Sequence, residues 1–259
     1  MDFSLKDHQK LIRDTVRQFM EGEVRPNVKE MEKQERFPAA EIRKLGEMGC
    51  CGMLVPEEWG GPGLDTVSYV LMLEEVARVH TAMSTAIGVT NSAVQVPILM
   101  FGSEAQKKKY LRRLASGEML GAFCLTEPAA GSDAAGIQAR AILEKGRDGG
   151  VYRLNGTKTW VTNGSVAGVL IVFAKTNPEA GGKGISAFLV EPGLKGFRVG
   201  RHEDKMGQKS SPSVEILLND CEVPVENRVG AEGEGLKIAL SALDGGRIGI
   251  GAQAVGLAQ

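Results

Sequence analysis

Residues 123–133 read Phe-Cys-Leu-Thr-Glu-Pro-Ala-Ala-Gly-Ser-Asp, and this stretch divides the chain into two sequence patterns. Before it, apolar side chains recur at helical spacing, whereas the long segment after it consists of short runs typical of strands. The stretch breaks at Glu127-Pro128 and turns through Gly131 onto Ser132 and Asp133. Proline fixes φ and glycine adopts conformations that other residues avoid, so this turn can present N–H groups and hydroxyls to a polar ligand. A plain strand-to-loop junction capped by serine and aspartate explains the same residues equally well.

Residues 1–117 are predicted to form an all-helical N-terminal domain. Segment 83–101 is almost wholly uncharged, which is typical of a helix buried on most sides, and Pro97 is expected to kink it. Asp65 has the position of an N-terminal cap, and so does Ser103, which has a glutamine three residues later. We therefore expect a group of helices organised around one buried helix, with no catalytic cluster of its own.

Residues 118–229 are predicted to form a second domain, an antiparallel β-sandwich or barrel. Runs rich in Val, Ile, Leu and Phe alternate there with Gly, Asn, Asp and Pro at the spacing of short strands. The predicted strands are 151–154, 159–162, 169–174, 185–190, 197–200 and 213–218. The expected fold class is therefore α+β multidomain, with helices first and strands second.

Residues 230–259 are predicted to begin a C-terminal helical domain. The segment 230–235 has the glycine spacing G-x-x-G-x-G, which reverses the order of a dinucleotide-binding loop, and no strand-loop-helix repeat surrounds it. We interpret it as the flexible approach to a helix. That helix runs to Gln259 without a cap, a proline or a polar tail. We therefore expect the chain to be cut within a longer protein, whose further helices would cover the apolar face.

The charge balance excludes several classes of function. The chain of 259 residues carries 31 basic and 32 acidic side chains, which argues against a nucleic acid or an anionic membrane as partner. The basic run 107–109 is interpreted as a solvated helix face.

Four cysteines form no Cys-x-x-Cys pair and three histidines are scattered, so no metal site is predicted. No signal sequence and no apolar run of about twenty residues is present, so we expect a cytoplasmic protein without a membrane span.

Four ordered motifs resemble the signatures of the acyl-CoA dehydrogenase family. They are residues 125–133, then Asn155-Gly156-Thr157-Lys158-Thr159-Trp160-Val161-Thr162-Asn163-Gly164, then Asp204-Lys205-Met206-Gly207, and last Leu243-Asp244-Gly245-Gly246-Arg247-Ile248. The resemblance covers the whole chain, and its nearest type is the short-chain, or butyryl-CoA, dehydrogenase. The family usually has glycine where this chain has Ala129 or Ala130, a small change that can shift the turn.

The resemblance implies an oxidoreductase of fatty acid β-oxidation that holds FAD beside an acyl-CoA thioester. Such an enzyme removes an α proton with a carboxylate and passes a β hydride to flavin N5, which leaves a trans-2-enoyl thioester. The family also implies a homotetramer, an electron-transfer flavoprotein as electron acceptor, and a four-helix bundle after the β domain.

The resemblance assigns a set of residues to the flavin. The expected FAD-binding residues are Phe123, Leu125, Thr126, Gly131, Ser132, Trp160, Val161 and Thr162. We expect Thr162 to bond flavin N5 and Trp160 to cover the ring system. Because these two residues stand at i and i+2 of one predicted strand, their side chains face the same side. The structural alternative for Trp160 is a core aromatic residue.

Substrate contacts are expected from Ser132, Asp244 and Arg247, the last two near the adenine and phosphate end of CoA. An exposed i,i+3 ion pair on one helix is the structural alternative for Asp244 and Arg247. In the isovaleryl branch of the family a glutamate precedes the matching arginine, and here that position is Gly246, which cannot remove a proton. We assign no catalytic residue, expect the base glutamate in the missing C-terminal region, interpret Glu127 as structural, and expect this chain alone to be inactive.

Two other functions fit the same motifs. A natural half-length chain would lend a flavin- or CoA-binding surface to a partner subunit without catalysing a reaction. An acyl-CoA oxidase would keep the fold and pass its electrons to oxygen. The intact mass of the natural protein distinguishes the first function, and oxygen consumption distinguishes the second. The sequence leaves the acyl-chain length open, because side-chain packing sets the depth of a pocket.

Overall fold

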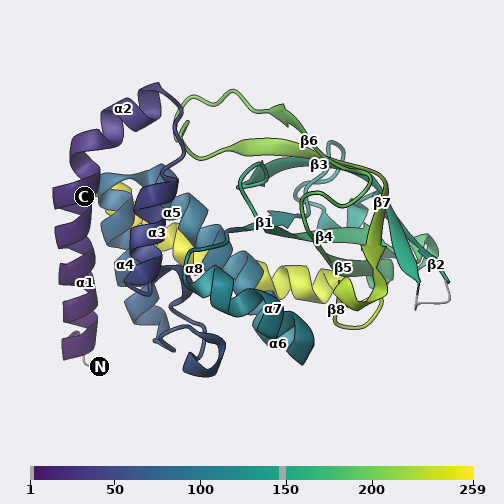
Figure 1. The fold of residues 1–259 in the computed structure, drawn as a ribbon, viewed down its shortest axis with the longest axis horizontal. Coiled ribbons are helices and arrows are strands. Elements are labelled where there is room, and N and C mark those ends of the chain that lie inside the picture. Colours follow the sequence, from purple (N-terminus) through teal and green to yellow (C-terminus); the bar gives the residue numbers. More distant parts are fainter. Residues whose placement is uncertain (1–2, 146–149) are drawn as a thin grey trace.

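The computed structural model describes residues 3–145 and 150–259, and its N-terminal part is helical, as predicted (Figure 1). Its helices are α1 Asp7–Phe19, α2 Val28–Lys33, α3 Ala39–Glu47, α4 Thr66–Val79, α5 Thr81–Gly88, α6 Val96–Phe101 and α7 Glu104–Ala115. Both predicted caps are confirmed. The Asp65 carboxylate accepts a hydrogen bond from the Ser68 N–H at 2.8 Å, and Ser103 and Gln106 exchange hydrogen bonds at the start of α7.

The helices α5 and α6 belong to one continuous stretch, Thr81–Phe101. The residues between them, Val89–Gln95, form π-helical turns, and Pro97 stands in the first turn of α6. A proline ring clashes with the carbonyl four residues earlier in a regular α-helix, and here that carbonyl lies within the wider turns. Contrary to the expectation from the sequence, this stretch is long and apolar enough for a membrane span, the one such helix among the described residues. Because 61% of its apolar window is buried inside the protein, it is the core helix of the domain.

After the helices, the described part of the chain forms one sheet of eight strands. The strands are β1 Gly121–Cys124, β2 Arg140–Glu144, β3 Val151–Thr162, β4 Val169–Lys175, β5 Ile185–Val190, β6 Phe197–His202, β7 Ser213–Pro224 and β8 Arg228–Val229. Their order is β6-β7-β3-β2-β4-β5-β8, with β1 beside β4. Most neighbours are antiparallel, as predicted, and the structure adds parallel pairings of β1 and β2 with β4.

The strand β3 joins two segments that the sequence pattern separated. Gly156, between them, has φ of 152°, and a Cβ at this position would lie 2.6 Å from the side chain of Ala139, the residue before β2. Glycine therefore lets the two strands approach each other at this point. The register of β3 against β7 shifts at Gly156 and again between Lys158 and Val161. Such bulges redirect side chains, and the second one contains Trp160.

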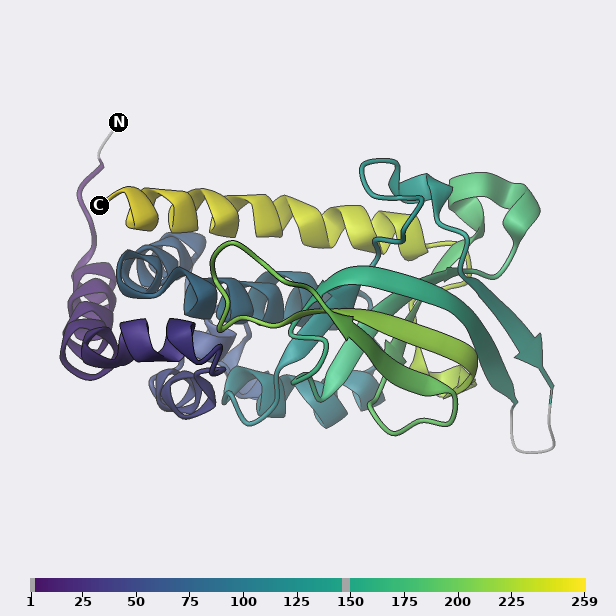
Figure 2. The ribbon, with the colours of Figure 1, turned by 90° about the horizontal axis from the view of Figure 1, so that it is seen from above.

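The helix α8, Gly235–Ala258, extends along both the helices and the sheet (Figures 1 and 2). Near its start, Ile238 packs into the apolar core between the sheet and helices α6 and α7. Near its end, Ala252 packs into the core of α1 and α4. A third core, which includes Tyr152 and Phe188, covers the opposite face of the sheet. A single helix thus contacts both parts of the fold.

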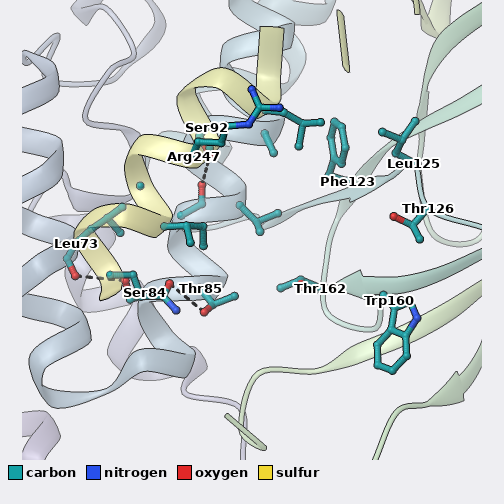
Figure 3. Close-up of a pocket in the computed structure, with 18 of the residues that line it drawn as sticks. Leu73, Ser84, Thr85, Ser92, Phe123, Leu125, Thr126, Trp160, Thr162 and Arg247 are labelled. Atoms are coloured by element: carbon teal, nitrogen blue, oxygen red, sulfur yellow. Dashed lines mark hydrogen bonds between the residues drawn. The ribbon is translucent and has the colours of Figure 1, made fainter. Parts of the chain in front are cut away.

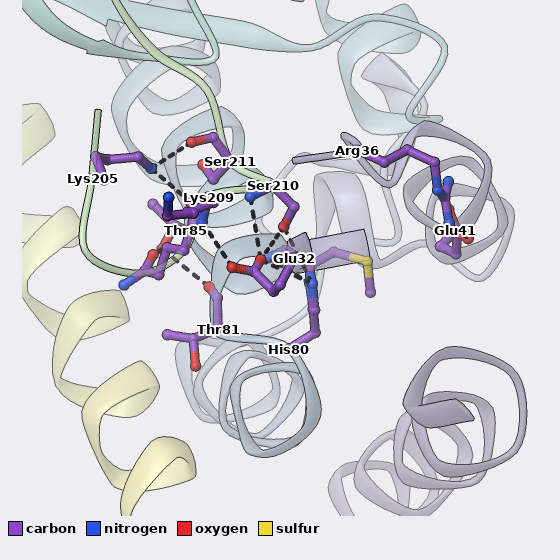
Figure 4. Close-up of polar contacts among 12 residues, drawn as sticks. Glu32, Arg36, Glu41, His80, Thr81, Thr85, Lys205, Lys209, Ser210 and Ser211 are labelled. Carbon is purple, nitrogen blue, oxygen red and sulfur yellow. Dashed lines mark hydrogen bonds and ion pairs between the residues drawn. The ribbon is translucent and has the colours of Figure 1, made fainter. Parts of the chain in front are cut away.

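The loop between β6 and β7 binds the sheet to the helices (Figure 4). The Glu32 carboxylate of α2 accepts hydrogen bonds from the main-chain N–H groups of Lys209 at 2.8 Å and Ser210 at 3.3 Å. The Ser210 hydroxyl also contacts Glu32, and it lies 3.3 Å from Nε2 of the buried His80. Within the loop, Lys205 Nζ donates to two main-chain carbonyls at 2.7 and 2.5 Å. Lys205 of the third sequence motif therefore folds this loop, and Lys209 and Ser210 fix it on α2.

Candidate functional site

A cavity of about 740 Å³ lies where the sheet, the core helix and α8 meet (Figure 3). Nine of the residues singled out in the sequence line it, namely Phe123, Leu125, Thr126, Gly131, Ser132, Trp160, Thr162, Gly246 and Arg247. They come from three motifs that are far apart in the chain. The fold therefore gathers the motifs around one hollow space.

The turn after β1 forms the first wall of the cavity. The main chains of Glu127 and Ala130 exchange hydrogen bonds at 2.9 and 3.1 Å, which closes a tight turn around Pro128. The Thr126 carbonyl accepts a hydrogen bond from the main-chain N–H of Thr159 in β3 at 2.9 Å. At Gly131 a Cβ would meet one described atom within 4 Å, the Thr126 methyl at 4.0 Å. Protein packing therefore does not require glycine there, and the open space belongs to the cavity.

Trp160 and Thr162 form the wall that faces this turn. Trp160 is 60% exposed and has φ of 58°, in the left-handed region that a bulky residue rarely adopts. Both side chains line the cavity, as their i, i+2 spacing predicted, even though the bulge interrupts the strand at Trp160. Val161 lies between them, and its side chain is 1% exposed in the core of the sheet. The strained backbone therefore holds a large aromatic surface at the cavity.

Asp244 and Arg247 form an ion pair one turn apart on α8. Their side chains are 74% and 67% exposed, so this pair is the local i,i+3 contact that was the structural alternative. Arg247 lines the cavity, whereas Asp244 is not among its lining residues. The structure thus brings the arginine to the site and leaves the aspartate on the surface.

Apart from the fourth motif, which supplies Leu243, the helical half of the cavity consists of residues that the sequence did not single out. They are Tyr69, Leu73, Ser84, Thr85, Gly88, Val89, Ser92 and Ala93 from α4 to the π-helical turns, and Leu240, Gly249, Ile250 and Gln253 from α8. The Tyr69 hydroxyl is buried beside Ser92, and burial raises its pKa to about 12. At this end Thr85 Oγ1 lies 2.8 Å from the Gln208 amide oxygen and 3.1 Å from that of Gln253. The uncharged composition of the core helix was the available signal for this wall.

No carboxylate or histidine lines this cavity within the residues that the structure describes. Glu127 is close in sequence, but its carboxylate contacts the buried Lys158 at 2.7 Å and the main-chain N–H of Ala139 at 3.0 Å. The described residues also contain no group of His, Cys, Asp and Glu that could hold a metal ion. The four cysteines are free and buried, as expected for reduced thiols. The walls can therefore bind and orient a ligand, but they supply no general base.

Comparisons with known proteins agree with this arrangement. Residues 6–118 match the model of the acyl-CoA dehydrogenase N-terminal domain, and residues 122–221 match that of the middle domain. A short-chain specific acyl-CoA dehydrogenase of Clostridium acetobutylicum is 44% identical over 259 residues, which are 100% of this chain and 67% of that protein.

Two solved structures share the fold. One is a chain described with the electron transferring flavoprotein of Acidaminococcus fermentans; its TM-score is 0.95 at 47% identity, over 99% of this chain and 66% of that one. The other is an acyl-CoA dehydrogenase from Bacillus anthracis complexed with FAD. Its TM-score is 0.89 at 38% identity, over 98% of this chain and 42% of that one.

The chain is shorter than these proteins. It spans 60–68% of the length of the curated relatives that it matches. Within that span the two domain models occupy the helical part and most of the sheet, in the family's order. The chain belongs to the acyl-CoA dehydrogenase family.

Proposed function

We propose that the protein acts in the FAD-dependent α,β-dehydrogenation of a short-chain acyl-CoA thioester to a trans-2-enoyl-CoA. The observation that carries this proposal is the cavity itself. On one side it presents an exposed indole, a hydroxyl and a glycine turn, and on the other an apolar wall of helices. A flat polar cofactor needs the first kind of surface and an acyl chain needs the second, and the two ligands can meet only where these surfaces adjoin.

The residues of the sheet side fit a flavin. The indole of Trp160 offers an exposed flat surface on a strained backbone, and the space beside Gly131 lets a ligand approach the main chain. Thr126, Ser132 and Thr162 add hydroxyls at the cavity. FAD, when bound, supplies the acceptor for the hydride. We assign it to Phe123, Leu125, Thr126, Gly131, Ser132, Trp160 and Thr162, with Val161 contributing through its main chain because its side chain is buried in the sheet.

The residues of the helical side fit the substrate. Apolar side chains such as Leu73 and Ile250 line this half, and the hydroxyl of Ser132 lies at its boundary with the turn. Arg247 is the cationic side chain among the described lining residues, so we assign it to a phosphate of CoA. Asp244 would hold the Arg247 guanidinium in place through their ion pair. We place the catalytic base outside this chain and propose that the chain alone is inactive.

The flavin assignment is tested at Thr162 in the full-length protein. A hydroxyl that stabilises charge on the reducing flavin should be worth about 10²-fold in rate, as for a single hydrogen-bond donor at a developing charge. We expect Thr162→Ala to lower the rate of flavin reduction by butyryl-CoA in stopped-flow absorbance, and Thr162→Ser to retain it. A Thr162→Ala variant that reduces at the normal rate would remove Thr162 from the site.

The proposal also includes the electron acceptor, the oligomeric state, the cellular location and the pathway. We propose an electron-transfer flavoprotein as acceptor, a homotetramer in the cytoplasm, and a role in fatty acid β-oxidation. The similarity to a chain described with an electron transferring flavoprotein supports this acceptor. Oxygen consumption during turnover tests it, because a dehydrogenase coupled to a flavoprotein should consume little oxygen without that partner. Rapid stoichiometric oxygen uptake would instead indicate an oxidase.

A further inference from the structure

Two charged side chains, Glu127 and Lys158, lie inside the β domain. Lys158 is 0% exposed and Glu127 is 7% exposed, and Lys158 Nζ lies 2.7 Å from Glu127 Oε1. Burial lowers the pKa of Lys158, and the neighbouring carboxylate opposes that shift. A buried charge is costly unless it is paired, so each of these residues requires the other. Neither residue lines the cavity, yet each belongs to a motif that does.

Lys158 fixes the main chain of the turn next to the cavity. Its Nζ donates to the Leu125 carbonyl at 3.1 Å, and the next residue, Thr159, donates its N–H to the Thr126 carbonyl at 2.9 Å. In a trans peptide the C=O and N–H groups point in opposite directions. The Thr126 N–H is therefore held on the side of the chain that faces away from Lys158. A cation on the Leu125 carbonyl also polarises this peptide unit and makes its N–H a stronger donor.

Glu127 closes the loop that carries the rest of the turn. Its carboxylate accepts hydrogen bonds from the main-chain N–H groups of Gln138 at 2.5 Å and Ala139 at 3.0 Å. These contacts join the two ends of the loop 127–139. Gly131 and Ser132, both lining residues of the cavity, lie between those ends. One carboxylate thus fixes both ends of the loop and the lysine of β3.

Stability alone does not account for this pair. Replacing a buried ion pair by apolar residues of similar volume is often neutral or stabilising, whereas removing one partner is strongly destabilising. An apolar pair would lose the directional hydrogen bonds to the main chain. It would not bind the Leu125 carbonyl, and it would not accept hydrogen bonds from the two N–H groups at 138–139.

We propose that Glu127 and Lys158 are positioning residues for the bound flavin. Together they aim the Thr126 N–H and hold the loop 127–139 against the cofactor. The inference rests on the proposed function, because it takes the ligand of this cavity to be a flavin. It gives Glu127 and Lys158 a role that acts through the main chain rather than through contact with substrate.

The test uses the full-length protein and three variants. Lys158→Met removes the cation, and Glu127→Gln combined with Lys158→Met removes both charges while keeping similar side-chain volumes. The glutamine oxygen can still accept from the N–H groups at 138–139, so the double variant isolates the loss of the Lys158 contact to the Leu125 carbonyl. Lys195→Met is the matched control, because Lys195 is a 79% exposed lysine of the same domain that pairs with Glu222 at 3.0 Å. Four quantities are measured: the melting temperature of the apoprotein, the Kd for FAD by fluorescence titration, and the absorption spectrum and the reduction potential of the bound flavin.

We expect the double variant to regain most of the melting temperature that Lys158→Met loses. Its affinity for FAD should stay about ten-fold weaker than that of the unmodified protein, the value of one well-directed hydrogen bond, and its flavin spectrum and potential should stay shifted. Lys195→Met should change none of these quantities. A double variant with normal FAD affinity, spectrum and potential would overturn the proposal and leave the pair a purely structural role.

A further variant serves if Lys158→Met yields too little folded protein. Glu127→Asp keeps the charge partner of Lys158, but its shorter side chain cannot hold both the lysine and the N–H groups at 138–139. We expect weaker FAD binding from Glu127→Asp, and normal binding with a normal spectrum would contradict the proposal. If the unmodified protein itself binds no FAD, the proposed function fails instead, so the two failures are distinguishable.

Discussion

The backbone of Trp160 gives the sharpest prediction, because its strain can be separated from its ring. A left-handed conformation costs an ordinary residue about 1–2 kcal/mol, and glycine avoids this cost but loses about 0.5–1 kcal/mol more conformational entropy on folding than alanine. Trp160→Ala and Trp160→Gly both remove the indole, at φ of 58°. They differ only in the backbone, so the glycine variant should be more stable by about 1 kcal/mol.

The indole itself predicts the effect on cofactor binding. Trp160 is 60% exposed, and its side chain offers about 200 Å² of surface, so roughly 120 Å² is available to a ligand. Covering that area at about 25 cal/mol per Å² would contribute up to about 3 kcal/mol. Both variants should therefore bind FAD more weakly by the same factor, which is at most roughly 150-fold.

Two assays measure the backbone strain and the contribution of the indole to FAD binding independently. Urea unfolding of the apoprotein gives the difference in the free energy of unfolding between the two variants, and FAD titration of the folded protein gives the two dissociation constants. A glycine variant no more stable than the alanine variant would show that the left-handed backbone is unstrained. Unchanged FAD affinity in both variants would show that the exposed indole does not cover the cofactor.

Three further predictions concern stability. Gly251→Ala on α8 should stabilise the protein by about 0.5–1 kcal/mol through helix propensity, since no described atom lies within 4 Å of the new Cβ. Gly46→Ala should instead destabilise it, because the new Cβ would lie 2.2 Å from a main-chain oxygen. Equal changes in the free energy of unfolding of the two variants, measured by urea unfolding, would contradict this prediction. Burial lowers the pKa of His80 below its value of about 6.5 in the unfolded chain, so the unfolded chain binds the proton first as the pH falls. The melting temperature should therefore fall as the pH drops below about 6.5, and His80→Asn should make that fall smaller. Asn163 is fully buried and donates to two main-chain carbonyls at 2.9 and 3.1 Å, so Asn163→Ala should cost about 2–4 kcal/mol in the free energy of unfolding; a loss below about 1 kcal/mol would show that water replaces the amide.

The fold was predictable where the information is local. Asp65 and Ser103 cap their helices as the sequence indicated, because a cap depends on residues within one turn. The parallel pairing of β1 with β4 was not predictable in this way, since its partners are far apart in the chain. The union of two predicted strands into β3 also depends on a distant contact, the close approach of Gly156 to Ala139. Spacing therefore located most of the strands but not their neighbours.

The site was predictable on the side where motifs supply it. Trp160 and Thr162 reach the cavity, whereas Asp244 remains on the surface and Val161 points into the sheet core. The helical wall escaped prediction for a physical reason. Periodicity shows that the face of a helix is apolar, but tertiary packing decides whether that face meets a core or a cavity, and Leu73 illustrates the second case.

The turn motif contains a carboxylate, and its contacts decide what that carboxylate can do. A general base needs a free oxygen within hydrogen-bond reach of the proton that it removes. Glu127 accepts hydrogen bonds from Lys158 and from the two N–H groups at 138–139, and it lies outside the cavity. Glu127 is therefore not placed to act as a general base, and its contacts instead fix the main chain of the turn in place.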